Sequence, residues 1–181
     1  MGGLVAVKSR RASRQKLLKE YPGASIVDLT SKAEAPFVRF SPFFPHGNIP
    51  VPFSAPRTAA SVEGIWQALK VFESEDVDES KLDVRSMRGI KRSVRRFGRC
   101  LGHRAGLHGE RLLGYLEARE QIYLPSYSWV LRHCLRAELE ALRGMARRGP
   151  LLLLDYETNA DVADLSKPLS HAALVMRHLV T

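Results

Sequence analysis

The chain has 181 residues, a net charge of +9 and 45% apolar residues, which together exclude wholesale disorder and allow a single domain with a hydrophobic core. No apolar run approaches the roughly 18 residues that a membrane span requires, and from the order of apolar and basic residues after Met1 we expect no signal peptide. The two cysteines, Cys100 and Cys134, lack metal-ligand spacing, so we expect a cytoplasmic protein without a membrane anchor, metal or cofactor.

The first third of the chain predicts a basic arm, a strand and a long ordered loop. Residues 1–20 are expected to form a basic N-terminal arm or helix, and residues 21–181 the domain itself. Residues 24–29 predict a short strand. Residues 36–56 hold six of the ten prolines with phenylalanines between them. Proline excludes regular helix and central strand, so we predict an extended loop packed on the core.

The middle of the chain predicts two helices separated by an acidic loop. Val62, Ile65, Leu69 and Phe72 recur at helical spacing and predict an amphipathic helix over 61–72, with Ser61 as its N-cap. An acidic loop follows over 73–83. A basic helix is predicted over 84–97.

The last third predicts further helices and one more strand. Helices are expected over 110–120 and 126–147, the second ended by Gly149 and Pro150. Residues 151–156 predict a buried strand, and a last helix is expected over 168–178. The predicted fold is therefore a single α+β domain, predominantly helical, with a small sheet that contains the 24–29 and 151–156 strands.

The positive charge lies almost entirely in one stretch. Residues 85–148 hold 15 Arg and Lys against 5 Asp and Glu, whereas the rest of the chain is close to neutral. A basic face of this kind attracts anions such as nucleic acid, a nucleotide phosphate or an acidic protein, and it is equally typical of a merely solvated surface.

One edge of the predicted 61–72 helix collects chemically useful side chains. At 100° per residue, Glu63, Gln67 and Lys70 fall in one column beside the apolar stripe, and Trp66 lies on the border between the two. Periodicity alone is compatible with a solvated edge. The alternative is a site that the preceding Phe- and Pro-rich loop covers.

These residues, in this order, resemble the NADAR/YbiA-like family. The family opens on a motif similar to Phe40-Ser41-Pro42-Phe43, continues with a Ser-Glu-x-x-x-Gln-Ala-x-Lys motif, and has weaker matches further along. The corresponding residues here are Ser61, Glu63, Gln67, Ala68, Lys70, Gly98, Arg99, Arg104, Ser128, Trp129, Asp161 and the 169–176 segment. Pro42 stands where the family has Asn, and the family's Trp-Gly-x-Gly loop is absent.

The resemblance implies an N-glycosidase that acts on ADP-ribosylated or phosphoribosylated substrates, including ADP-ribosylated nucleic acid. A carboxylate near C1′ stabilises the oxocarbenium-like transition state of such a reaction or orients water. The resemblance then assigns Glu63 and Asp161 as catalytic carboxylates. It assigns substrate binding to Phe40, Ser41, Phe43, Trp66, Gln67, Lys70, Arg99, Arg104, Trp129 and His171.

Two other functions remain open from the sequence. The first is a non-catalytic nucleotide or nucleic-acid binding protein that uses the basic 85–148 face, and its binding would weaken steeply with salt. The second is a structural or partner-binding protein with a degenerate pocket. A core role is an alternative for Trp129, a loop cap for Asp161 and a helix-start contact for His171.

Overall fold

The computed structural model describes residues 3–180. The chain forms two compact units: Met1–Ser41 together with Leu135–Thr181, and Pro42–Cys134. The division between the two units lies after residues 41 and 134. The mixed α+β class predicted from the sequence is confirmed. None of the helices within residues 3–180 combines the length and apolarity needed to cross a membrane.

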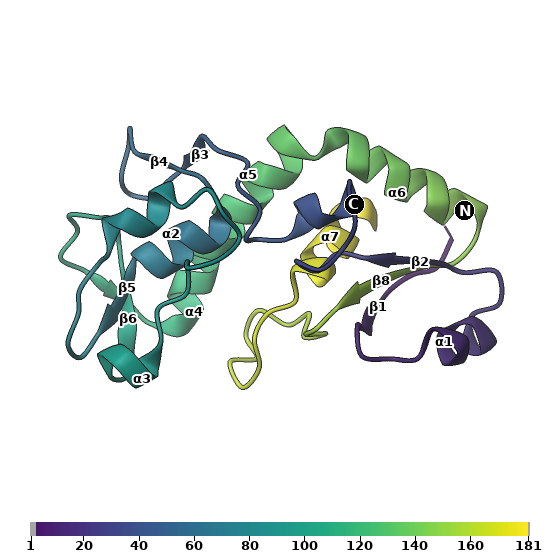
Figure 1. Cartoon of the computed structure of the whole chain (residues 1–181), viewed down its shortest axis with the longest axis horizontal. Coiled ribbons are helices and arrows are strands. Elements are labelled where there is room, and N and C mark those ends of the chain that lie inside the picture. The colour runs from purple at the N-terminus through teal and green to yellow at the C-terminus, as the bar shows by residue number, and fades with distance from the viewer. Residues whose placement is uncertain (1–2, 181) are drawn as a thin grey trace. The chain divides into compact units, whose positions relative to one another are not determined.

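The first unit is built on a three-stranded parallel sheet (Figure 1). Its strands lie in the order β1 (Val5–Ser9), β8 (Leu151–Asp155) and β2 (Ser25–Asp28). Leu151, Leu152 and Leu153 are fully buried, because a central parallel strand is covered on both faces. The predicted strands near 24–29 and 151–156 are confirmed. Strand β1 was missed, since it lies within the predicted N-terminal arm.

Helices flank this sheet. They are α1 (Arg14–Glu20), the 3-10 turn η1 (Phe37–Phe40), α6 (Arg136–Arg148) and α7 (His171–Val180). The predicted start of the last helix at Pro168 is wrong by three residues, because Ser170 is the residue whose hydroxyl accepts from the Ala173 amide as an N-cap.

The second unit holds short strands around α2. Its elements are β3 (Ile49–Pro50), β4 (Thr58–Ala59), α2 (Val62–Ala68), β5 (Lys70–Phe72), η2 (Glu79–Asp83), α3 (Val94–Phe97), β6 (Cys100–Arg104), β7 (Leu112–Leu113), α4 (Tyr115–Ala118), the π-turn η3 (Arg119–Tyr123) and α5 (Leu124–Cys134). Strands β5, β6 and β7 form an antiparallel sheet. Gly102 is required in β6, because a Cβ there would lie 2.5 Å from the Leu113 oxygen.

Three helix predictions are wrong in this part of the chain. The predicted 61–72 helix ends at Ala68, and Lys70 begins a strand that pairs with β6. The predicted 84–97 helix is reduced to α3, because buried Ile90 and Arg92 tie the segment before it to the core. The 110–120 region is divided between β7, α4 and η3.

The long helix predicted over 126–147 is also wrong, because it is interrupted. Helix α5 ends at Cys134 and α6 begins at Arg136. Leu135, which lies between them, is fully buried and has non-helical dihedral angles. The apolar spacing continues through the break, so periodicity could not reveal it.

Candidate functional site

The carboxylate of Glu63 is held in the first turn of α2. The Ser61 hydroxyl caps this helix by accepting from the Gly64 amide at 2.9 Å, as expected for an N-cap. The Glu63 amide donates to the Pro42 oxygen at 2.9 Å. Only 9% of Glu63 is exposed, so the backbone fixes a largely buried acid in place.

Gln67 orients one oxygen of that carboxylate. Its Nε2 donates to Glu63 Oε1 at 2.8 Å, and its own Oε1 accepts from the Arg92 backbone amide at 2.9 Å. The two bonds together fix which way the Gln67 amide points. Among the described residues, the second Glu63 oxygen has no hydrogen-bond partner. One side of the carboxylate is therefore anchored and the other is available.

Arg92 holds the backbone around Gln67 and Lys70 in place through its buried guanidinium. Its guanidinium donates to the backbone oxygens of Gln67, Lys70 and Asp76 at 3.1, 2.8 and 2.6 Å, and it lies over the rings of Phe72 and Phe97. Sequence reasoning missed Arg92, because nothing in a run of basic residues distinguishes the buried one from its exposed neighbours.

Lys70 begins strand β5, two residues after the end of α2. The negative charge of Glu63 affects its pKa. Burial is the main influence and lowers the pKa of the Lys70 ammonium, while the Glu63 charge opposes that shift. Within residues 3–180 the ammonium forms no hydrogen bond or ion pair. The predicted column of Glu63, Gln67 and Lys70 thus persists in part, with Lys70 placed by strand β5 instead of the helix.

Trp66 lies in an aromatic cluster. Its ring centroid is 3.8 Å from that of His103 and 5.7 Å from that of Tyr123. His103 is 2% exposed, and within the described chain neither ring nitrogen has a hydrogen-bond partner. Burial, followed by the Lys70 charge, lowers the pKa of His103 to about 3, so the ring is neutral. A Trp66 backbone group opposes this shift without reaching hydrogen-bond geometry.

The two arginines that the resemblance assigns to substrate binding both pair with acidic residues. Arg104 forms a two-pronged ion pair with Asp76, at 3.1 and 2.8 Å, and donates to the Glu110 oxygen. Arg99 has a side chain that is 78% exposed and lies 3.6 Å from Glu73. A phosphate would have to displace Asp76 to bind the Arg104 guanidinium, whereas the exposed Arg99 guanidinium keeps N–H donors that Glu73 does not occupy.

The other two predicted residues of this unit also have aromatic or cationic neighbours. Phe43 carries the Lys91 ammonium 5.5 Å from its ring centroid. Trp129 stacks on His133, with ring centroids 4.6 Å apart. Substrate stacking by Trp129 is therefore limited to the ring face that His133 leaves uncovered.

Four predicted site residues lie in the first unit. Phe40 is fully buried and stacks against Phe37, and Ser41 is buried at the end of η1. Asp161 is exposed in the loop after β8, where its carboxylate accepts from the Ala163 amide at 2.9 Å. This is the loop-cap geometry that the sequence left open as an alternative to catalysis.

His171 belongs to a buried ionic cluster that the sequence did not predict. Its Nδ1 lies 3.0 Å from Asp155 Oδ2, and its Nε2 lies 2.8 Å from the Leu29 oxygen. Both neighbours are acceptors, so both nitrogens must donate and the imidazole is protonated. The Ser170 hydroxyl donates to the same Asp155 oxygen at 2.8 Å.

The pKa values of this pair follow from that geometry. Burial alone would lower the pKa of His171, but the hydrogen bond and charge of Asp155 outweigh burial and raise it. Burial likewise pushes the pKa of Asp155 upward, and His171 and Ser170 together bring it below its usual value. Because Ser170 bonds to Asp155 and the Nε2 of His171 faces a backbone oxygen, the cluster lacks the arrangement of a Ser-His-Asp triad.

The comparisons with known proteins identify one family, whose function is unknown. A family model described as "Family of unknown function (DUF6939)" matches residues 9–175. Neither a curated protein nor a solved structure matches the chain significantly. Across residues 3–180 no three metal-ligating side chains converge.

Proposed function

The chain belongs to the DUF6939 family, whose function is unknown, and we propose that it is an N-glycosyl hydrolase acting on an ADP-ribosylated or phosphoribosylated substrate. The observation that supports the proposal is the burial and hydrogen bonding of the Glu63 carboxylate. A largely buried carboxylate has one oxygen fixed by Gln67 and one oxygen without a partner among the described residues. The resemblance of the Ser61–Lys70 segment to the NADAR/YbiA-like motif supports the same role.

This geometry suits cleavage at an anomeric carbon. As the bond between C1′ and the base nitrogen breaks, its electron pair leaves with the base and the sugar gains positive charge. The available Glu63 oxygen would stabilise that charge and accept a proton from the water that attacks C1′. Lys70, whose ammonium has no partner within residues 3–180, would hold a phosphate oxygen as a point charge. Asp161 as second carboxylate remains a prediction from the resemblance.

Substitution of Glu63 by Gln tests the proposal, because it removes the negative charge and keeps an oxygen for Gln67. The assay measures release of free base or ADP-ribose from an ADP-ribosylated oligonucleotide and from a ribosylpyrimidine monophosphate. We expect Glu63→Gln to lower turnover by about 10²-fold or more, with an unchanged melting temperature. Glu75→Gln, at an exposed acid of the same unit, is the control. Equal turnover in wild type and Glu63→Gln would refute the assignment.

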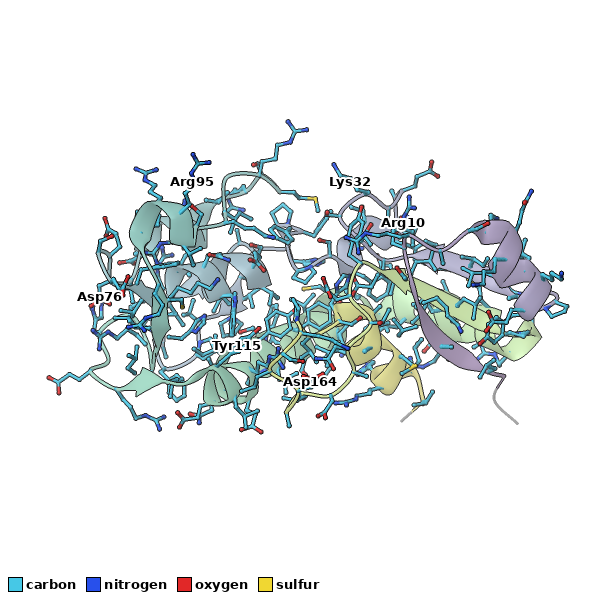
Figure 2. All side chains as sticks on the ribbon, turned by 90° about the horizontal axis from the view of Figure 1, so that it is seen from below. Arg10, Lys32, Asp76, Arg95, Tyr115 and Asp164 are labelled. Carbon is cyan, nitrogen blue, oxygen red and sulfur yellow. The ribbon has the colours of Figure 1, made fainter. Side chains whose placement is uncertain are left out.

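A second candidate, binding of a polyanion without catalysis, is favoured by one surface segment. Residues 85–99 contain no acidic residue, and six of their cations are exposed: Arg85, Arg88, Lys91, Arg95, Arg96 and Arg99. Figure 2 shows Arg95 projecting from this segment. The remaining cations of the 85–148 stretch are divided between the two units. Salt-sensitive binding of an oligonucleotide that survives Glu63→Gln, without base release, would favour this candidate.

A further inference from the structure

The open edge of strand β2, in the first unit, lies in a groove of about 760 Å³. Residues 24–28 all line the groove. Consecutive side chains of a strand point to opposite faces of the sheet. A groove that touches five consecutive residues therefore runs along the backbone edge of the strand and not over one face.

The backbone groups on that edge face away from the sheet. The Ser25 amide donates to the Pro150 oxygen at 2.8 Å, and the Leu29 amide donates to the Leu154 oxygen at 3.1 Å. In a parallel ladder, alternate residues of a strand face the same neighbour. Residues 25, 27 and 29 therefore face β8, whereas Ile26 and Asp28 present their N–H and C=O groups to the groove, as on any edge strand.

The walls of the groove carry an excess of positive charge. They contribute four cations, Arg10, Arg14, Lys32 and Arg148, and two acids, Asp28 and Glu34. Figure 2 shows Arg10 and Lys32 on the same side of this unit. Arg10 and Asp28 form an ion pair at 2.5 Å and cancel one another. Three exposed cations, which have no ion pair to any described residue, then face a single acid, Glu34.

We propose that this groove binds an extended acidic segment of a partner protein, which adds to the sheet as a strand beside β2. The main-chain groups of Ile26 and Asp28 would pair with the segment, and Arg14, Lys32 and Arg148 would contact its carboxylates, in the mode by which strand addition combines backbone affinity with side-chain selectivity. This surface is independent of the glycosidase proposal, because none of the residues that line it is assigned a catalytic or substrate-binding role.

Edge protection and self-pairing account for the same features less completely. Positive charges beside an edge strand also protect it from pairing with other chains, but protection requires no groove of about 760 Å³ along the strand. Pairing of β2 with β2 of a second copy would bring two sets of the same cations together, which like-charge repulsion opposes. An extended acidic segment accounts for all three features: the unpaired backbone groups of β2, the groove beside them and the positive charge of its walls.

An NMR titration of the full chain tests the proposal with two defined probes. One is an eight-residue peptide of alternating Glu and Val, and the other has Lys in place of each Glu. We expect the Glu peptide to shift the amide signals of Ile26 and Asp28 and to slow their hydrogen exchange, and the Lys peptide to leave them unchanged. Lys32→Glu with Arg148→Glu should weaken binding of the Glu peptide at least about tenfold.

Ile26→Pro tests the backbone contact separately from charge. Proline removes an N–H that faces away from β8, a position where edge strands tolerate it, and Ile26→Val keeps that N–H as the matched control. We expect Ile26→Pro to abolish binding and Ile26→Val to retain it; if Ile26→Pro fails to fold, the charge-reversal pair decides. The proposal is overturned by equal shifts with both peptides, or by no shift of residues 24–28 at millimolar peptide. It is also overturned if Lys32→Ser with Arg148→Ser increases self-association without weakening peptide binding, which would assign the cations to edge protection.

Discussion

Acid should destabilise the second unit through His103, and the magnitude follows from its burial. Burial and the nearby Lys70 charge lower the pKa of His103 from 6.5 to about 3, so between these values the unfolded chain binds a proton that the folded protein does not. Stability from this group is therefore complete above pH 6.5 and is lost as the pH falls below it. The loss is about 1.4 kcal/mol per pH unit, or about 2 kcal/mol at pH 5.

Urea unfolding of wild type and His103→Phe at pH 7 and pH 5 measures this effect. Phenylalanine keeps a ring beside Trp66 and removes two nitrogens that have no hydrogen-bond partner among residues 3–180, so it should be neutral or stabilising at pH 7. Relative to wild type, its free energy of unfolding should then rise by about 2 kcal/mol at pH 5. His108→Gln, at an exposed histidine, should follow wild type. Parallel pH profiles for wild type and His103→Phe would refute the reasoning.

Three further substitutions probe other contacts. His171→Gln should lower the free energy of unfolding by about 3 kcal/mol at pH 6. Because the pKa of His171 is raised in the folded protein, its contribution to stability is complete below pH 6.5. The difference between the urea midpoints of wild type and His171→Gln should therefore shrink as the pH rises through that higher pKa. Arg92→Met removes three hydrogen bonds to backbone oxygens and should cost about 2–4 kcal/mol by calorimetry, whereas exposed Arg95→Met should change little. Gly64→Ala should destabilise, because its Cβ would lie 2.7 Å from a backbone oxygen of η2, whereas Gly144→Ala in α6 meets only flexible arginine side chains and should stabilise by up to about 1 kcal/mol. Thermal melts in which both glycine variants change alike would contradict the packing described for α2.

Sequence patterns predicted the buried central strand of the first unit and the start of α2, whose cap is local. The 151–155 strand is a run of leucines and an aspartate, and a short apolar run of this kind predicts a buried parallel strand. Ser61 caps α2 through a contact within one turn, so its role is encoded locally. Glu63 and Gln67 are four residues apart on that helix, and helical geometry brought them together as expected.

The features that the sequence did not predict depend on partners distant in the chain. Lys70 leaves the helix because it pairs with His103 of β6, and the apolar residues around it are buried in either conformation. Arg92 became a buried anchor through oxygens 16 to 25 residues away. The Asp155 and His171 pair joins a strand end to a helix start, and neither residue type alone distinguishes such a pair from a surface contact.

The chain order of the first unit has a consequence for protein synthesis. Strand β8 is the only strand in residues 3–180 that pairs with both β1 and β2, and it is made after every residue of the second unit. During translation, therefore, β1 and β2 cannot pair with β8 until after residues 42–134 have been synthesised. Domains generally fold as units as they emerge from the ribosome, so the inserted unit is expected to fold first, and ribosome-bound chains arrested between the two events should resist protease only within 42–134.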